Sequence, residues 1–283
     1  MNATLATASR TPVYFLSIGG PNFIEATEHP AYAALSRIGH EITTNVKPKA
    51  VLVLSAHWQS AYTNRLEINV ASNAPIIYDF YNFPKHYYEV QYPNRGSPEI
   101  AERVIEKLGN VGIEVERVER GLDHGVWAGF LAAFDPKTNP VGVPIVQVSL
   151  LNRDDPEGHY KLGQALQSLR DEGVCIIACG MAVHNLQDFR KLRMSGESRK
   201  VMPYVHTFDE ALKDAATAAA GERKEKMLGL MKEDLARRAH PTIEHVLPVF
   251  VAAGAAGGDV GERVWTMGEG SLSWAQYRFG DVA

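Results

Sequence analysis

The chain has 283 residues, of which 45% are hydrophobic and 22% are charged, a composition typical of a soluble globular protein. Its 29 basic and 33 acidic residues give a net charge of −4 and form no long run of one sign, which argues against nucleic acid or an anionic membrane as a partner. No stretch is long and apolar enough to span a bilayer. We therefore expect a cytoplasmic protein that acts on small molecules; its oligomeric state stays open.

The N-terminal residues 1–11 are rich in Ala, Thr and Ser, and we expect them to form a disordered leader before a single catalytic domain at 12–283. Apolar runs with β-branched residues predict strands along this domain. These runs are residues 13–18, 50–55, 66–70, 111–118, 144–150, 174–179 and 263–267.

Helical patterns lie between several of these strands, at residues 98–108, 156–170, 205–220 and 222–238. Strands that alternate with helices are typical of the α/β class. The pattern predicts a single domain with a central, mainly parallel or mixed sheet flanked by helices.

Residues 75–93 are dense in aromatic side chains and are bounded by prolines. They predict a long irregular excursion, either over a pocket or around an aromatic mini-core, and both interpretations stay open. We assign Tyr78 and Asp79 of this segment to a substrate pocket.

The two cysteines, Cys175 and Cys179, fall in the predicted strand 174–179. Four strand residues span roughly 13 Å, which is too far for a disulfide between the two. We interpret both as small core residues in a reducing compartment.

Histidines follow two of the predicted strands at their carboxyl ends. His57 comes after the apolar run 50–55, and His184 comes after the run 174–179. In open α/β sheets, ligands gather at the carboxyl ends of the strands, so both imidazoles can reach one crevice. Neutral imidazole is a good metal ligand, although a hydrogen-bonded structural histidine is the alternative for each.

Near the C-terminus, His240 and His245 stand on either side of Pro241, which suits the first turn of a helix. We expect His240 at the helix entry and His245 inside the helix, after Glu244. His29, His40, His86, His159 and His206 have no comparable context, and we interpret them as surface or structural residues.

Four segments in this order resemble the class III extradiol ring-cleaving dioxygenases, and among them the 4,5-DOPA extradiol dioxygenases. The resemblance runs from about Val13 to the end of the chain. The segments are Ser55-Ala56-His57-Trp58, Gly121-Leu122-Asp123-His124-Gly125-Val126-Trp127, Ala182-Val183-His184-Asn185-Leu186 and Pro241-Thr242-Ile243-Glu244-His245.

The resemblance implies a role for each of these histidines. His57 and His245 correspond to ligands of Fe(II), with Zn(II) as an alternative in the purified protein. His184 corresponds to the acid/base residue and His124 to a histidine that binds substrate or transfers a proton. Tyr78, Asp79, Trp127 and Ile18 are expected in the pocket of a catechol or related phenolic substrate, with His240 and Glu244 behind the ligands.

One position departs from the family pattern. The family's first metal ligand is a histidine in Ser-His-Gly-Ser-Pro or Ser-His-Gly-Gly-Pro, whereas this chain reads Ser17-Ile18-Gly19-Gly20-Pro21. Isoleucine has no lone pair and cannot coordinate a metal.

Three interpretations of Ile18 stay open. The first is a weakened metal site that keeps His57 and His245 and adds water or a side chain such as Asn22 or Glu25. The second is a metal-independent isomerase, cyclase, dehydratase or lyase that uses His184 and His124. The third is a catalytically silent binding protein.

Overall fold

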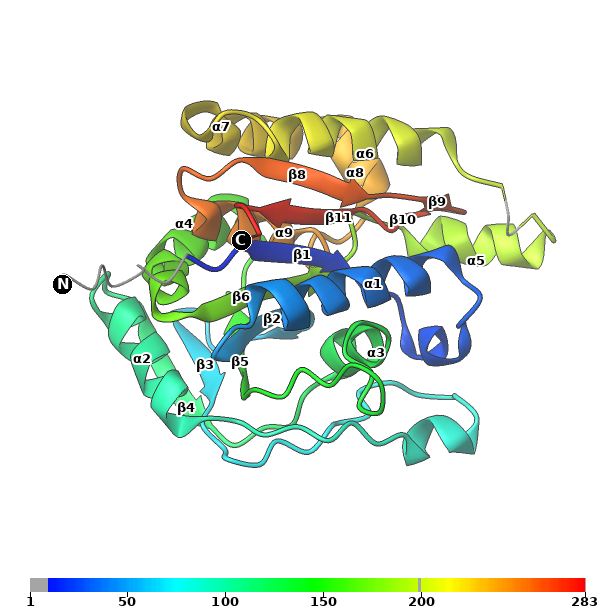
Figure 1. The fold of residues 1–283 in the computed structure, drawn as a ribbon. Coiled ribbons are helices and arrows are strands. Elements are labelled where there is room, and N and C mark those ends of the chain that lie inside the picture. Colours follow the sequence, from blue (N-terminus) through cyan, green and yellow to red (C-terminus); the bar gives the residue numbers. More distant parts are fainter. Residues whose placement is uncertain (1–9, 198–199, 283) are drawn as a thin grey trace.

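The centre of the computed structural model, which describes residues 10–197 and 200–282, is an eight-stranded mixed sheet (Figure 1). Its order is β4-β3-β5-β2-β6-β1-β11-β8. Strands β5, β2, β6 and β1 are mutually parallel, whereas β3 runs antiparallel to β5, and β11 runs antiparallel to β1. The bounds are β1 Val13–Ser17, β2 Ala50–Gln59, β3 Arg65–Asn69, β4 Glu114–Val118, β5 Ile145–Leu150, β6 Val174–Gly180, β8 Gly261–Trp265 and β11 Gln276–Phe279.

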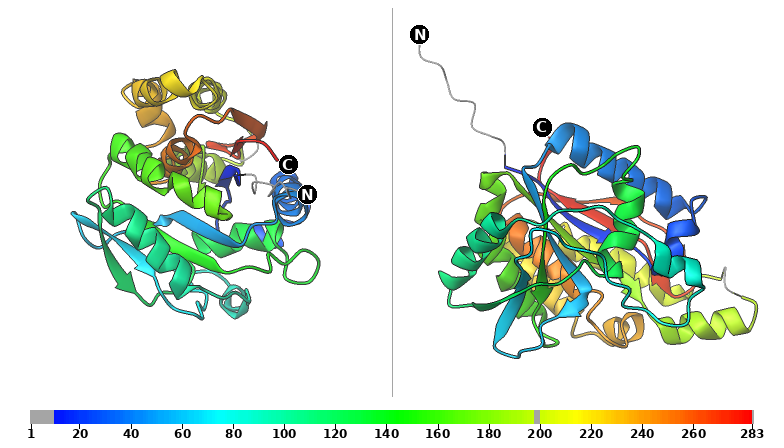
Figure 2. Two further views of the ribbon diagram at one scale, coloured as in Figure 1. Left: turned by 60° about the vertical axis from the view of Figure 1, so that its left-hand side comes forward. Right: turned by 90° about the horizontal axis from the view of Figure 1, so that it is seen from below.

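Both faces of this sheet are buried, as the continuous apolar strands require. Along β2, Leu52 and Leu54 belong to one hydrophobic cluster, and the alternating Val51 and Val53 belong to another. The sheet therefore lies between two helical layers, which confirms the predicted α/β class (Figure 2).

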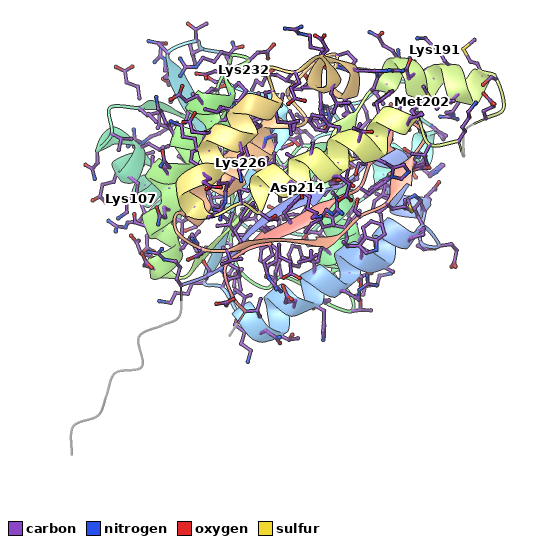
Figure 3. All side chains as sticks on the ribbon, turned by 90° about the horizontal axis from the view of Figure 1, so that it is seen from above. Lys107, Lys191, Met202, Asp214, Lys226 and Lys232 are labelled. Atoms are coloured by element: carbon purple, nitrogen blue, oxygen red, sulfur yellow. The ribbon has the colours of Figure 1, made fainter. Side chains whose placement is uncertain are left out.

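One layer contains α1 (Pro30–Glu41) and α3 (His124–Ala133), which pack against each other. The opposite layer is built on α9 (Leu247–Ala256) and α4 (Pro156–Leu166). The remaining helices are α2 Pro98–Gly109, α5 Leu186–Met194, α6 Pro203–Ala216, α7 Ala220–Leu230 and α8 Asp234–Ala239. In the view from above, α6 and α7 form an outer surface that carries Asp214 and Lys226 (Figure 3).

Several element boundaries differ from the sequence prediction. The predicted strand 111–118 begins only at Glu114, because Gly112 has a φ of 77° and turns the chain first. Strand β2 continues to Gln59, so that His57 lies within the strand and not beyond it. The predicted helix 222–238 is two helices, α7 and α8, separated by a turn.

A second, three-stranded sheet was not predicted. It has the order β7-β10-β9, with β7 Val183–His184, β10 Leu272–Ser273 and β9 Gly268–Glu269. Strands of two residues carry no recognisable period, so this sheet is determined by tertiary contacts.

Arg10 and Thr11, the first two described residues, are held by hydrogen bonds to the rest of the domain. Arg10 Nε donates to Asp171 at 2.7 Å, and Thr11 Oγ1 donates to the Val174 carbonyl at 2.6 Å. The expected disordered leader at 1–11 is therefore wrong for Arg10 and Thr11, and its residues 1–9 lie outside the described residues.

Both cysteines are buried free thiols in β6, as predicted, and burial raises the pKa of Cys175 to about 12. None of the helices in the described part of the chain is long and apolar enough to cross a membrane.

The fold predicts an acid sensitivity at His159, which is buried in α4 with its Nδ1 at 2.7 Å from the Asp155 carbonyl. Burial lowers the pKa of His159 from 6.5 to about 4. The unfolded chain therefore takes up a proton at higher pH than the folded one, and the stability contributed at neutral pH is lost as pH falls from about 6.5 to about 4. We expect a loss of about 2 kcal/mol between pH 7 and pH 5 in urea unfolding.

Replacing His159 by Gln should flatten this pH dependence, whereas His40→Gln, at an exposed position of α1, should leave it unchanged. An equal pH slope in the His159 variant and the parent chain would contradict the assignment.

Candidate active site

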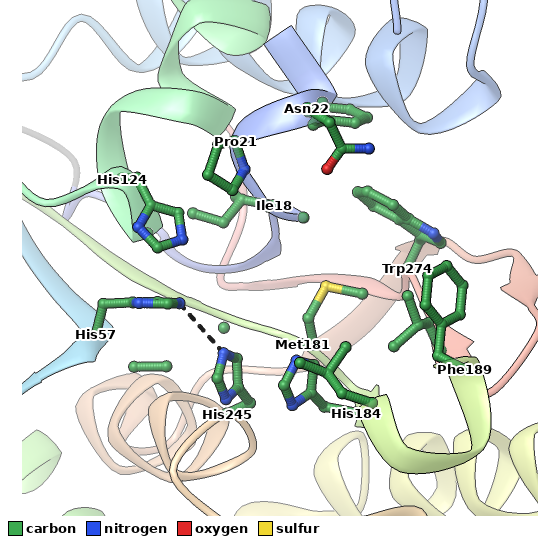
Figure 4. A pocket seen from close by; sticks show the side chains of 18 of the residues that line it. Ile18, Pro21, Asn22, His57, His124, Met181, His184, Phe189, His245 and Trp274 are labelled. Carbon is green, nitrogen blue, oxygen red and sulfur yellow. Dashed lines mark hydrogen bonds between the residues drawn. The ribbon is translucent and has the colours of Figure 1, made fainter. Parts of the chain in front are cut away.

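A cavity of about 590 Å³ opens beyond the carboxyl ends of β1, β2 and β6. Five histidines line it: His29, His57, His124, His184 and His245. The three strand ends are adjacent, because Ser17 pairs with Gly180, and Ser55 pairs with Cys179. The parallel sheet thus brings together imidazoles that are far apart in the sequence (Figure 4).

His57 and His245 face each other across this cavity. Their Nε2 atoms lie 3.3 Å apart, and their rings are perpendicular, with an interplanar angle of 89°. Two nitrogens that each lie about 2.0–2.1 Å from one tetrahedral metal are separated by about 3.3 Å. The observed spacing therefore suits two ligands of a single ion.

Asp79 holds two of the imidazoles from behind. Its Oδ1 accepts from the backbone N–H of His124 at 2.8 Å and contacts His124 Nδ1 at 2.9 Å, and its Oδ2 lies 3.4 Å from His57 Nδ1. Burial raises the pKa of Asp79, but the hydrogen bonds with His124 and His57 outweigh this effect and bring the pKa below its usual value. The carboxylate is therefore charged, and it contacts Nδ1 of both rings, so that their Nε2 atoms are not held by Asp79.

Glu244 plays the same part for His245. Its Oε1 lies 2.8 Å from His245 Nδ1 and also accepts from Thr242 Oγ1 at 2.9 Å. Burial opposes ionisation of Glu244, but its contacts with His245 lower the pKa to about 2. A carboxylate on the far nitrogen is the usual partner of a metal-binding histidine.

The position of His245 depends on a close backbone approach. The Met181 N–H donates to the His245 carbonyl at 2.9 Å, and a Cβ on Gly180 would lie 2.3 Å from that oxygen. Only glycine fits there. Contrary to the prediction, His245 is not inside a helix: it lies in the turn before α9, which begins at Leu247.

His184 stacks on His245, with ring centroids 3.6 Å apart and an interplanar angle of 17°. Burial lowers the pKa of His184, and the neighbouring His245, His240 and His57 lower it further. The ring is neutral and offers a lone pair. The neutral form is favoured because the ring is desolvated within a cluster of imidazoles.

Ile18 occupies the wall above the two facing nitrogens and is only 2% exposed. A Cβ on Gly129 of α3 would lie 2.4 Å from Ile18 Cγ2. The missing side chain at Gly129 therefore forms a notch that receives the branched side chain of Ile18, and position 18 is well packed.

The Nε2 atoms of His57 and His245 have a spacing that suits one ion, and Ile18, which has no donor atom, lines the same cavity. Within the described residues, two groups of three possible ligands have their atoms within 4.8 Å: His57, Asp79 and His124, and His184, Glu244 and His245. In these groups Asp79 and Glu244 contact the Nδ1 atoms of imidazoles. Each carboxylate therefore orients a ring through Nδ1 and leaves the opposite nitrogen, Nε2, as the possible ligand atom.

Residues 5–275 match the family described as the catalytic LigB subunit of aromatic ring-opening dioxygenase. The chain belongs to this LigB family, the class III extradiol dioxygenases. It is 35% identical over 270 residues to a 4,5-DOPA dioxygenase extradiol of Beta vulgaris, covering 94% of this chain and 95% of that protein. It is 30% identical to a 4,5-DOPA dioxygenase extradiol of Escherichia coli K12, covering 89% and 87%.

A crystal structure of an uncharacterized Escherichia coli K12 protein has the same fold. The TM-score is 0.74 at 24% identity, and the match covers 96% of this chain and 100% of that one.

In this LigB-family chain, three of the four expected pocket residues, Tyr78, Asp79 and Trp127, lie outside the cavity lining. Asp79 stands behind His57 and His124, as described above. Trp127 is fully buried and donates from Nε1 to the Ile77 carbonyl at 3.0 Å, and Tyr78 donates from its hydroxyl to the Val90 carbonyl at 2.7 Å. Both pack behind Phe80, so they support the wall and do not form it.

His240, which was expected behind the metal ligands, is buried at the end of α8, and its Nε2 lies 2.9 Å from the Ala182 carbonyl. It holds the segment that carries His184. Of the two extra ligands considered, Asn22 lines the cavity, whereas Glu25 binds the Tyr87 hydroxyl.

The aromatic excursion at 75–93 covers the pocket and also forms a small aromatic core. Phe80 and Phe83 line the cavity, and Phe80 also packs on Tyr88 with ring centroids 5.0 Å apart. Both interpretations of this segment are therefore confirmed.

Other cavity residues were missed by the sequence analysis, above all Trp274, Glu269, Met181 and His29. One signal could have located His29: it precedes Pro30, and proline favours the first position of a helix, where His29 caps α1.

Proposed function

We propose that this protein is an extradiol ring-cleaving dioxygenase that acts on a catechol or related phenolic and holds its metal through two imidazoles. The observation that carries the proposal is the 3.3 Å separation of the Nε2 atoms of His57 and His245, each oriented by a carboxylate. The relatives named 4,5-DOPA dioxygenase extradiol support a catechol-like substrate.

His57 and His245 would hold the metal in this proposal. A bound Fe(II) would bind the catechol oxygens and dioxygen and would pass electrons from the catechol to dioxygen. His184, stacked on His245, offers the lone pair that takes a hydroxyl proton of the substrate. His124 presents Nε2 to the cavity, because Asp79 holds its Nδ1.

The remaining walls orient the ring and exclude water. Ile18, Phe80, Met181 and Trp274 are apolar or aromatic residues around the cavity. An aromatic substrate is a good match for such a lining, since ligand sites are mostly apolar with few polar groups.

A metal-independent acid/base reaction is the second candidate, and the packing of Ile18 against Gly129 favours it. In that case His184 and His124 would move protons on a phenolic substrate, and Asp79 would orient the His124 ring through its Nδ1.

Incubation with Fe(II), dioxygen and simple catechols tests the proposed function. We expect a yellow ring-opened product that forms slowly and disappears when a chelator is added. Conversion that proceeds without oxygen and is unaffected by chelation would instead support the acid/base enzyme. Absence of any conversion across a panel of catechols and phenols would overturn both.

A further inference from the structure

The small sheet places three cavity residues in one row. Leu272 of β10 stands opposite His184 of β7 on one side and opposite Glu269 of β9 on the other. Directly paired residues of antiparallel strands point to the same face, and all three side chains line the cavity. Because neighbouring strands are about 4.8 Å apart, the backbone of Glu269 stands roughly 10 Å from that of His184.

Glu269 is held in place by two donors. Its Oε2 accepts from Trp274 Nε1 at 2.9 Å and lies 3.3 Å from His29 Nε2. The other nitrogen of His29, Nδ1, accepts from the Ala31 backbone N–H at 3.2 Å, so it carries no proton. The ring hydrogen therefore lies on Nε2, which donates to Glu269.

The surroundings of this carboxylate are rigid. The Trp274 indole packs on Phe23 and on His29, with ring centroids 4.8 Å apart in both pairs. Gly19 leaves room for it, since a Cβ there would lie 2.4 Å from Trp274 Cη2. A carboxylate with fixed partners loses little conformational freedom when it binds a ligand.

The Glu269 carboxylate can accept a further hydrogen bond through Oε1. Across residues 10–197 and 200–282, the only hydrogen-bond donors that reach Glu269 are His29 and Trp274, and both reach Oε2. Its side chain is 34% exposed and lines the cavity. Arg193 of α5 is the other charged residue of the lining, and it is exposed.

We propose that Glu269 selects catechols that carry, on a short arm, a hydrogen-bond donor such as an ammonium or hydroxyl group. The inference rests on the proposed function, because it places the catechol ring at the imidazoles. A catechol ring bound beside His184 would cover only part of the row formed by His184, Leu272 and Glu269. A short arm on that ring would extend along the row to the Glu269 carboxylate. An ammonium group binds more tightly than a hydroxyl group, since it adds charge to the hydrogen bond.

Calorimetric titration without oxygen tests this preference on the full chain, once after chelator treatment and once with Zn(II). The probes are 4-ethylcatechol, 4-(2-hydroxyethyl)catechol, dopamine and 3-(3,4-dihydroxyphenyl)propionate. We expect dopamine to bind about tenfold more tightly than 4-ethylcatechol, the hydroxyl probe to fall between them, and the propionate to bind most weakly.

Two variants of Glu269 and one control sharpen the test. Glu269→Gln should bind dopamine and 4-ethylcatechol equally, with an unchanged melting temperature. Glu269→Asp keeps the charge on a shorter side chain and should prefer an aminopropyl arm over the aminoethyl arm of dopamine. Glu28→Gln, at an exposed position outside the cavity lining, should behave as the parent chain.

Equal affinity of the parent chain and Glu269→Gln for dopamine would refute the role of Glu269. So would tighter binding of the propionate, which would assign the preference to Arg193. If 4-ethylcatechol and the other probes all fail to bind the parent chain, the proposed function falls together with the inference; binding without an arm preference removes the inference alone.

Discussion

Replacing Ile18 by histidine is expected to raise the affinity of the pocket for a divalent metal by at least about 100-fold. Loss of a residue that only orients a metal ligand typically lowers metal affinity 10–100-fold, and a ligand itself contributes more. In the proposed site, the facing nitrogens of His57 and His245 would provide two ligands, and Ile18 lines the same cavity without a donor atom. A histidine at position 18 would complete the three-ligand face that the family resemblance implies.

Competition with a chelator, followed by the visible spectrum of bound Co(II), measures this effect. The parent chain should bind metal weakly, and replacing His57 or His245 by Ala should remove that binding. Ile18→Leu is the matched control, since leucine retains the apolar wall and adds no ligand. Unchanged affinity in Ile18→His would show that position 18 does not point to the metal.

Replacing His184 by Gln is expected to lower turnover by about 10²–10⁴-fold, the usual contribution of a proton-transferring side chain. The reason is its position: His184 stacks on His245 at 3.6 Å and is neutral, so its lone pair can receive a substrate proton. Glutamine is similar in size and forms hydrogen bonds but cannot take up the proton.

Steady-state kinetics and substrate binding, measured on the same preparation, separate this role from a structural one. We expect kcat to fall while the affinity for 4-ethylcatechol changes little. The exposed His206→Gln variant serves as the control. Unchanged turnover in His184→Gln would contradict this role and would assign the proton transfer to His124.

The convergence of His57 and His184 on one cavity was predictable because each comes at or near the carboxyl end of an apolar strand. His57 and His184 were placed after apolar runs, and parallel strands deliver their carboxyl ends to one edge of the sheet. His245 was identified through the family resemblance, although its surroundings were predicted wrongly. The helix begins only at Leu247, with Pro248 in its first turn, whereas Pro241 lies in a bend before the turn at Glu244–Val246.

The sequence did not show which aromatic residues line the cavity and which lie behind its wall. Tyr78 and Trp127 were expected in the pocket and lie behind its wall, whereas Phe80 and Phe83 line the cavity. Tyr78 lies in an irregular segment, which has no period to show which side chains turn inward, and Trp127 lies on α3, where residues on every side of the helix are buried.

The sequence by itself determined the α/β class, the burial of both sheet faces, the apolar strands that lead to His57 and His184, and the isoleucine that replaces the family's histidine at position 18. Only the tertiary structure decided that Gly129 makes room for Ile18 and that Glu269 shares its hydrogen bonds with His29 and Trp274. Local patterns record the direction of the backbone over a few residues, whereas His29 and Glu269 meet across 240 residues of chain. Such contacts follow from how the helices and the small sheet pack, which no local period encodes.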